Sequence, residues 1–131
     1  MLPISKENIL QKIESAPLDP AVGIRIALLW EDLNKSYYCS SIAPNKKIAA
    51  HYHNEGDELY FIVEGRGLMR LGYPKTTGIE WKQEFNVCGG DFFIVPPKMV
   101  HQLINESDNN LTAIFGCDKN HLGIDRFVIN D

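Results

Sequence analysis

The chain has 131 residues, of which 44% are hydrophobic and 23% are charged, a composition typical of one soluble globular domain. Thirteen Lys and Arg against 17 Asp and Glu give a formal net charge of −4 with no basic run, which argues against nucleic acid as a partner. No apolar stretch approaches the roughly 18 residues of a membrane span, and the polar start of the chain lacks the apolar centre of a signal peptide. We therefore expect a cytoplasmic domain that binds neither nucleic acid nor a membrane.

Three cysteines lie far apart in the sequence, at Cys39, Cys88 and Cys117. Because no two of them form a Cys-x-x-Cys pair, the sequence predicts neither a thiolate metal site nor a disulfide framework. Each lies in an apolar, strand-like run, where cysteine packs as a small hydrophobic residue. Cys117 is also a candidate for the edge of a pocket.

Helical signals are confined to the start of the chain. A short segment near residues 5–15 has Ile9, Leu10 and Ile13 on one face. Ser5 is placed to cap its first turn. We expect one short helix here and treat residues 1–19 as an extension of the main domain.

The rest of the chain, residues 20–131, has the pattern of a single all-β domain. Short strands separated by Gly, Pro, Asn and Asp turns are expected at Gly23–Leu29, Tyr37–Ile42, Lys47–His53, Glu58–Val63, Leu68–Leu71, Glu80–Val87, Asp91–Val95, His101–Asn105, Leu111–Cys117 and Asp125–Ile129. Short strands without intervening helices favour an antiparallel sandwich or a small barrel over a parallel α/β sheet.

Two histidines, His51 and His53, are two residues apart in one of these runs. Successive side chains alternate across a strand, so both imidazoles leave the same face, with Cα atoms roughly 6.5–7 Å apart. Two rings at this spacing can converge on one metal ion. The alternative is the polar face of an edge strand.

An acidic residue follows this pair after a turn. Residues 54–57 form the turn and Glu58 begins the next strand, so a tight corner would bring its carboxylate back beside the two rings. Glu58, Tyr60 and Ile62 share one largely apolar face, which makes Tyr60 and Ile62 candidates for a pocket wall. A carboxylate directed into this interior needs a cation as partner. The alternative is a solvated acid in the local acidic cluster.

A third histidine, His101, begins a strand after the Pro96-Pro97 turn. Leu103 and Asn105 share its face by the two-residue period. Neutral imidazoles together with one carboxylate suit Fe(II), Mn(II), Ni(II), Cu(II) or Zn(II). Four protein ligands on a six-coordinate ion would leave about two positions for water, substrate or dioxygen, as in a catalytic site.

At these positions the sequence resembles the cupin superfamily. The residues that match its two motifs are His51, His53, Glu58 and Gly65, followed by Gly90, Pro96, His101 and Asn105. The spacing agrees throughout. Two turn positions where the family usually has glycine carry Asn45 and Lys98 instead, which affects loop detail and leaves the fold expectation unchanged.

The resemblance implies a single-domain antiparallel jelly-roll barrel, or double-stranded β-helix, with one divalent metal ion at its centre. It implies His51, His53, Glu58 and His101 as the ligands and Asn105 as a structural or outer residue. Gly65, Gly90 and Pro96 match turn positions. The 24 residues between the motifs, 66–89, suggest an extended hairpin around residues 74–81.

The fold alone does not name a reaction, because the family includes dioxygenases, decarboxylases, sugar isomerases and epimerases. The favoured interpretation is a metal-dependent enzyme of isomerase, epimerase or dioxygenase type acting on a small oxygenated molecule. The alternative is a non-catalytic module that binds a small ligand or the metal. We also expect a homodimer, because the strand with Ile24, Ile26, Leu28 and Trp30 offers more apolar area than one barrel would cover.

Several further residues have simpler interpretations. His121 is expected to be a solvated loop histidine. Trp81 and Phe85 are expected in the core or an interface. Arg66 and Arg70 are expected on solvated strands, although either could bind an anionic substrate.

Overall fold

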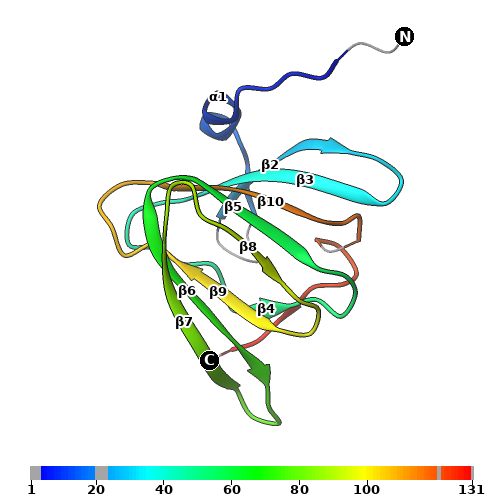
Figure 1. Ribbon diagram of the computed structural model, residues 1–131, viewed down its shortest axis with the longest axis vertical. Helices are drawn as coiled ribbons and strands as arrows, with labels where there is room; N and C mark the ends of the chain where they lie inside the picture. The colour runs from blue at the N-terminus through cyan, green and yellow to red at the C-terminus, as the bar shows by residue number, and fades with distance from the viewer. Residues whose placement is uncertain (1–3, 20–23, 121, 131) are drawn as a thin grey trace.

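The computed structural model describes residues 4–19, 24–120 and 122–130. Within these ranges the chain forms one short helix and a series of antiparallel strands (Figure 1). Their bounds are α1 (Ile9–Glu14), β1 (Leu18–Asp19), β2 (Ile24–Glu31), β3 (Lys35–Ile42), β4 (His51–Tyr52), β5 (Glu58–Glu64), β6 (Arg66–Pro74), β7 (Ile79–Cys88), β8 (Phe92–Val95), β9 (Val100–Ile104), β10 (Leu111–Asp118) and β11 (Phe127–Val128). In the described part of the chain, no helix is long and apolar enough to cross a membrane.

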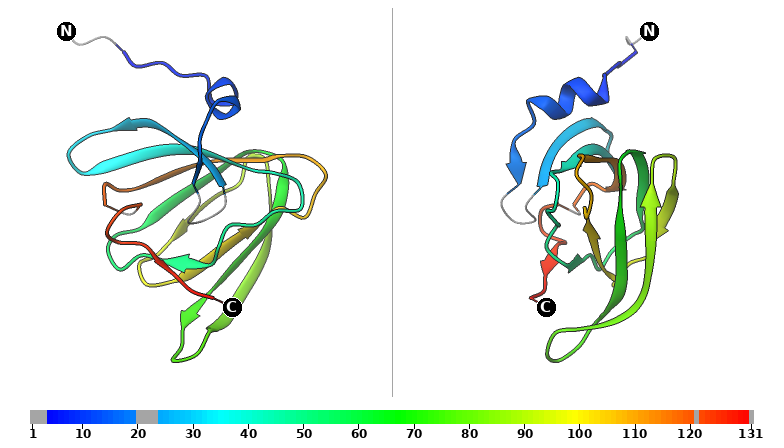
Figure 2. Two further views of the ribbon diagram at one scale, coloured as in Figure 1. Left: turned by 180° about the vertical axis from the view of Figure 1, so that it is seen from behind. Right: turned by 90° about the vertical axis from the view of Figure 1, so that its left-hand side faces the viewer.

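The strands form two sheets that face one another and enclose the core (Figures 1 and 2). One sheet has the order β1-β2-β3-β10-β5-β8 and the other has the order β11-β4-β9-β6-β7. Several neighbouring strands in these sheets are distant in sequence. For example, β3 pairs with β10, and β4 pairs with β9. The antiparallel all-β fold expected from the turn spacing is confirmed, and so is the jelly-roll arrangement that the resemblance implies.

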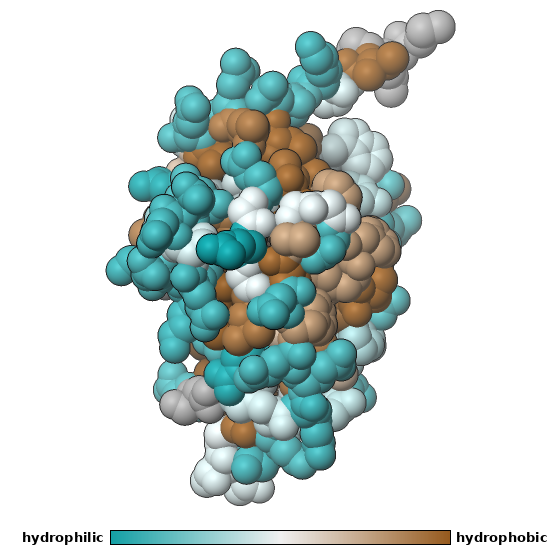
Figure 3. Space-filling view, turned by 60° about the vertical axis from the view of Figure 1, so that its left-hand side comes forward, coloured by the Kyte–Doolittle hydropathy of each residue, from teal (hydrophilic) through white to brown (hydrophobic). Residues whose placement is uncertain are grey.

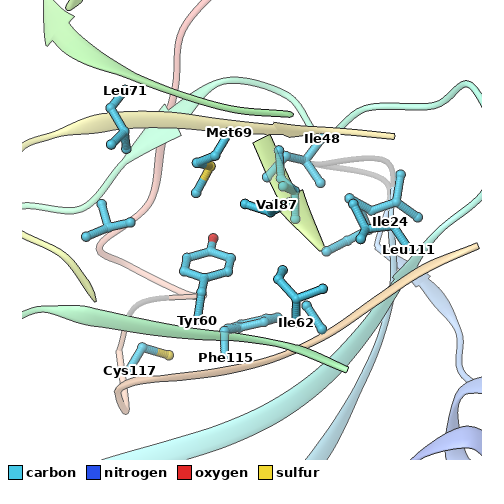
Figure 4. Close-up of a cluster of buried hydrophobic side chains, with 14 residues drawn as sticks. Ile24, Ile48, Tyr60, Ile62, Met69, Leu71, Val87, Leu111, Phe115 and Cys117 are labelled. Carbon is cyan, nitrogen blue, oxygen red and sulfur yellow. The ribbon is translucent and has the colours of Figure 1, made fainter. Parts of the chain in front are cut away.

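Large apolar side chains from both sheets fill the space between them. Ile62 and Tyr60 project from β5 toward Met69 and Leu71 on β6 (Figure 4). Tyr60 is stacked against Phe93, with 5.1 Å between the ring centroids. Burial of apolar area on this scale is the main stabilising term of such a domain.

The predicted strands are observed, with three differences. The run Lys47–His53 contributes a strand only at His51–Tyr52, preceded by an isolated bridge between Lys47 and Ile104. Asp125–Ile129 is reduced to Phe127–Val128. The pairing of β1 with β2 was not predicted, because two residues carry no readable period. Gly23, the predicted start of β2, lies outside the described residues. The hairpin predicted between the two motifs is formed by β6 and β7. A hydrogen bond from the Lys75 amide to the Gly78 carbonyl closes its turn.

The helix is shorter than predicted and has a different cap. The Asn8 side chain, not Ser5, accepts a hydrogen bond from the Gln11 amide at 3.1 Å. Ile13 is buried and Leu10 is exposed, so the predicted apolar face is only partly covered. Asparagine at the N-cap offers the same side-chain acceptor as serine, and it lies closer to the start of the apolar pattern.

The three cysteine thiols are free. Cys39 and Cys117 are buried as predicted, and burial raises the pKa of both thiols, that of Cys117 to about 12. The expectation that Cys88 packs as a small hydrophobic residue was wrong, because it ends strand β7 with its side chain exposed.

Strand β2 exposes less apolar surface than the sequence predicted. Ile24 is buried and Ile26 packs against the core, so neither adds to an exposed apolar surface. Leu28 and Trp30, further along the strand, are exposed.

At the two turn positions where the resembled family usually has glycine, the backbone has the left-handed conformation that glycine favours. Asn45 and Lys98 have φ angles of 62° and 69°, and they are the non-glycine residues with positive φ in the described chain. Glycine reaches this left-handed region at no steric cost, whereas a residue with a side chain is strained there. Lys98 keeps the conformation while its amide donates a hydrogen bond to the His53 carbonyl at 2.6 Å.

We predict that Lys98→Gly stabilises the protein. Relief of left-handed strain, about 1–2 kcal/mol, exceeds the entropic cost of glycine, about 0.5–1 kcal/mol, so the free energy of unfolding should rise by roughly 0.5–1 kcal/mol. Chemical denaturation measures this change. The control Lys82→Gly, within strand β7, should lower stability instead. Equal losses in both variants would contradict the explanation.

Candidate metal centre

Four side chains, three from the two facing sheets and one from the residue that follows β4, meet inside the barrel. His51, His53, Glu58 and His101 each place one ligand atom within 4.8 Å of the others, and all four residues are buried. His51 on β4 lies directly opposite His101 on β9 in the antiparallel register, and their ring centroids are 4.3 Å apart. Glu58 comes from the other sheet, at the start of β5. The structure therefore brings together the four residues that the sequence singled out.

Each histidine ring is oriented by a backbone carbonyl. The Nδ1 atom of His51 lies 2.9 Å from the Ala49 oxygen, and that of His101 lies 3.0 Å from the Met99 oxygen. The Nδ1 atom of His53 lies 2.5 Å from the Asp125 oxygen. A carbonyl only accepts hydrogen bonds, so each Nδ1 carries the hydrogen, which leaves Nε2 as the available lone pair. Metal-binding histidines are held in this way.

The Glu58 carboxylate faces two of these nitrogens. Oε1 lies 3.1 Å from His101 Nε2, and Oε2 lies 3.3 Å from His53 Nε2. An ionised carboxylate and an unprotonated imidazole nitrogen both accept hydrogen bonds, so they approach this closely only with a cation between them. A shared proton or a metal ion satisfies the requirement. Because three nitrogen donors and a carboxylate converge from several sides, the donor set fits a divalent transition metal ion.

Burial keeps His51 neutral. The residue is 5% exposed, and loss of hydration lowers the pKa of its imidazole to about 3, with a smaller lowering from neighbouring His101. A neutral imidazole is the form that binds metal. Burial also raises the pKa of Tyr60 far above its usual range, and the neighbouring Glu58 carboxylate raises it further.

A small cavity of about 30 Å³ adjoins the cluster and is lined by both His51 and Glu58. Tyr60 lines it, whereas Ile62 lies wholly within the core. Most of the remaining wall is apolar, contributed by Ile24, Ile26, Ile42, Ile48, Leu103, Phe115 and Leu122. Cys117 is part of the core cluster.

Residues near the C-terminus take part in the site and were not identified from the sequence. Asp125 supplies the carbonyl that orients His53, and its carboxylate accepts hydrogen bonds from the Asn54 and Glu55 amides at 2.8 and 2.9 Å. This carboxylate therefore holds the turn between His53 and Glu58. Seventy-two residues separate His53 from Asp125, and a backbone carbonyl has no sequence signature, so no local pattern could have revealed the contact.

The other candidate residues that the sequence suggested, as far as the structure describes them, lie outside the cluster. The Asn105 amide donates to the Ile42 carbonyl at 2.9 Å and to Asn109 at 2.8 Å, a structural role. Arg70 stacks on Trp81 at 3.9 Å from the ring centroid and contacts Glu84, away from the metal cavity. His121 lies outside the described residues.

The fold and the cluster define a double-stranded β-helix protein with a candidate metal centre. The cupin domain profile matches residues 39–116, more than half of the chain, and the chain therefore belongs to the cupin family. This segment contains all four residues of the cluster.

Other proteins share part of this sequence or the same fold. A segment of 72 residues is 36% identical to the uncharacterized protein MJ1618 of Methanocaldococcus jannaschii, covering 54% of this chain and 50% of that protein, so this chain spans about half of that relative's length. An uncharacterized conserved protein of Klebsiella pneumoniae with a double-stranded β-helix domain superposes with a TM-score of 0.68 at 15% identity, over 90% of this chain and 93% of its own. The capsular polysaccharide assembling protein CapF of Staphylococcus aureus superposes with a TM-score of 0.73 at 16% identity, over 88% of this chain and 32% of its own.

The depressed pKa of His51 predicts a pH-dependent stability of the metal-free protein. Between its folded pKa of about 3 and its unfolded value of 6.5, the unfolded chain binds a proton that the folded chain does not. The free energy of unfolding should therefore fall as pH falls through this window, by up to about 1.4 kcal/mol per pH unit from this group.

Urea denaturation of metal-free protein at several pH values between 6.5 and 4 measures this slope. His51→Gln should give a shallower slope than the natural chain, because it removes the titrating ring. Identical slopes would show that His51 does not contribute.

Proposed function

We propose that this cupin binds one divalent metal ion through His51, His53, Glu58 and His101 and acts as a metal-dependent enzyme on a small oxygenated molecule. The observation that carries the proposal is the convergence of the four ligand atoms within 4.8 Å in a buried site. The proposed reaction is an isomerisation, an epimerisation or a dioxygenation. In this proposal, residues 1–131 work as one cupin domain.

The chain's own residues would prepare this site for chemistry. The three backbone carbonyls hold the imidazoles with Nε2 facing the centre. Tyr60 lies beside Glu58 in the wall of the cavity. The apolar walls exclude water, which strengthens electrostatic interactions inside. A bound divalent ion would supply Lewis-acid chemistry or, if it is iron, redox chemistry.

CapF, which has a domain of the same fold, is named for the assembly of capsular polysaccharide. This supports a sugar-like substrate as a class to test first. A non-catalytic binding module is the second candidate, and the small cavity of about 30 Å³ supports the form of it that binds only the metal ion, since it leaves little room for a substrate beside the ion.

Metal analysis and turnover separate these candidates. Protein purified without added metal should contain close to one transition metal ion per chain by mass spectrometry. Oxygen uptake during a screen of sugars and small oxyacids would indicate a dioxygenase. Turnover without oxygen would indicate an isomerase or epimerase. Tight ligand binding without turnover would support the binding module, and absence of any metal uptake would refute the proposal.

Two variants on one strand separate metal binding from stability. His101→Gln should lower metal affinity at least about tenfold while the barrel stays folded, because a domain of this size has a sufficient core without metal. Leu103→Ala, also on β9 and 2% exposed, should lower the free energy of unfolding by about 2–5 kcal/mol and keep the metal. Calorimetric metal titration and denaturation measure the two effects. Full metal affinity in His101→Gln would contradict the ligand assignment.

We further propose that the protein is a homodimer that pairs through the outer face of the sheet containing β5. Residues paired in register share a face, and two such rows cross this sheet. The rows are Phe92, Phe61 and Ile114, and Ile94, Leu59, Gly116, Tyr37 and Trp30. Five of the side chains are between 37% and 59% exposed. Apolar side chains also reach the surface on the face shown in Figure 3.

Two copies of these apolar rows can cover one another across a twofold axis, because such an interface uses the same surface on both subunits. Phe61→Arg should therefore yield a monomer in analytical ultracentrifugation, whereas Tyr73→Arg, a similarly exposed aromatic position on β6 of the other sheet, should leave the dimer unchanged. A monomeric natural chain at micromolar concentration would refute the dimer.

A further inference from the structure

An ion pair lies in the wall of the cavity beside the candidate metal centre. The Arg126 guanidinium donates to the Asp19 carboxylate at 2.9 Å, and the two side chains are 15% and 17% exposed. Both residues line the cavity. Arg126 is the only Lys or Arg among the described residues that do so.

This pair joins the two ends of the chain. Asp19 ends β1, and Arg126 directly precedes β11, 107 residues later. Figure 2 shows β1 and the C-terminal segment on the same side of the barrel. Since the cavity is small, about 30 Å³, and drug-sized or metabolite-sized ligands occupy several hundred Å³, an organic ligand can enter only if groups in this wall separate.

The chemistry of the wall selects which ligand can do so. A guanidinium in a largely apolar wall needs a negative partner, because an unpaired charge with little access to water is strongly destabilising. A neutral ligand that displaced Asp19 would leave Arg126 uncompensated. A carboxylate or phosphate would replace Asp19 with another oxyanion, and it would fit the paired hydrogen-bond geometry that a guanidinium offers.

We infer that the cavity takes a small anionic ligand whose carboxylate or phosphate group replaces Asp19 on the Arg126 guanidinium. The inference rests on the proposed function in one respect, namely that the rest of such a ligand would face the metal. It assigns Arg126 as the residue that selects the charge of the ligand and Asp19 as the internal competitor for it.

A purely structural role for the ion pair makes a different prediction. If the pair only ties the chain ends together, breaking it from either side should have the same effect on ligand affinity. If Asp19 competes with the ligand, the two sides have opposite effects. Asp19→Asn removes the competitor and should tighten anion binding, whereas Arg126→Gln removes the receptor and should weaken it.

The test is calorimetric titration of the Co(II)-loaded protein with malonate, with inorganic phosphate and with neutral malonamide. The natural chain should bind at least one of the two anions and should not bind malonamide. Arg126→Gln should weaken anion binding about tenfold or more, as expected for loss of charge-assisted hydrogen bonds. Asp19→Asn should strengthen it severalfold. Arg126→Lys, which keeps the charge without the paired geometry, should fall between the natural chain and Arg126→Gln.

Arg70→Gln is the matched control, because Arg70 is also ion-paired but stacks on Trp81 away from this cavity. It should leave anion binding unchanged. Thermal unfolding of each variant shows that it is folded. The malonate and phosphate titrations, compared with each other, show which oxyanion the wall accepts.

Three results would overturn the inference. They are no binding of either anion by the natural chain, no change in Arg126→Gln, and a change in the same direction in Asp19→Asn and Arg126→Gln. Cobalt stoichiometry, measured first, reports separately on the proposed function. If the natural chain took up no cobalt, the proposed function would fail, and the same titrations on metal-free protein would still decide the role of Arg126.

Discussion

Three hydrogen bonds from imidazole Nδ1–H groups to backbone carbonyls determine the direction of every histidine in the cluster. Side-chain acceptors could rotate or be replaced by mutation, whereas these carbonyls move only if the backbone moves. The carbonyls of Ala49 and Met99 precede their histidines by two residues, while that of Asp125 is supplied by the far end of the chain. The candidate metal centre is therefore preorganised by the fold itself.

The same arrangement carries an electrostatic cost. A carboxylate and three imidazoles lie between two sheets whose other inward-facing side chains are mostly apolar. Polar groups in such surroundings need full pairing to avoid a large loss of hydration energy. Glu58 has contacts with both His53 and His101, and a cation among these groups would complete the pairing. These buried polar groups lower the stability of the metal-free barrel, and a bound cation would restore it.

The segment after β10 links this centre to the outer wall of the cavity. Asp125 orients His53 and holds the turn before Glu58, and the adjacent Arg126 reaches Asp19 in the first strand of the described chain. Displacement of Arg126 would therefore act on a backbone that also carries a histidine acceptor. The loop conformations near the cluster are similarly tied together, since the left-handed Lys98 donates its amide to the His53 carbonyl.

The sequence by itself determined most of the strands and the identity of the four clustered residues. The two-residue period places His51 with His53 and Glu58 with Tyr60, because side-chain alternation is a local property of any strand. Turn residues locate most strand ends for the same local reason, although they overestimate the strand around His51.

Only the tertiary structure decided how the site is oriented and how it is closed. The opposition of His51 and His101 depends on the register of β4 against β9, and the carbonyl of Asp125 and the pair of Asp19 with Arg126 come from segments far apart in the chain. Every residue has a backbone carbonyl, so the sequence does not show which one accepts a hydrogen bond. An isolated Asp or Arg belongs to no repeating pattern that would show its partner. Contacts of this kind become visible only once the chain has folded.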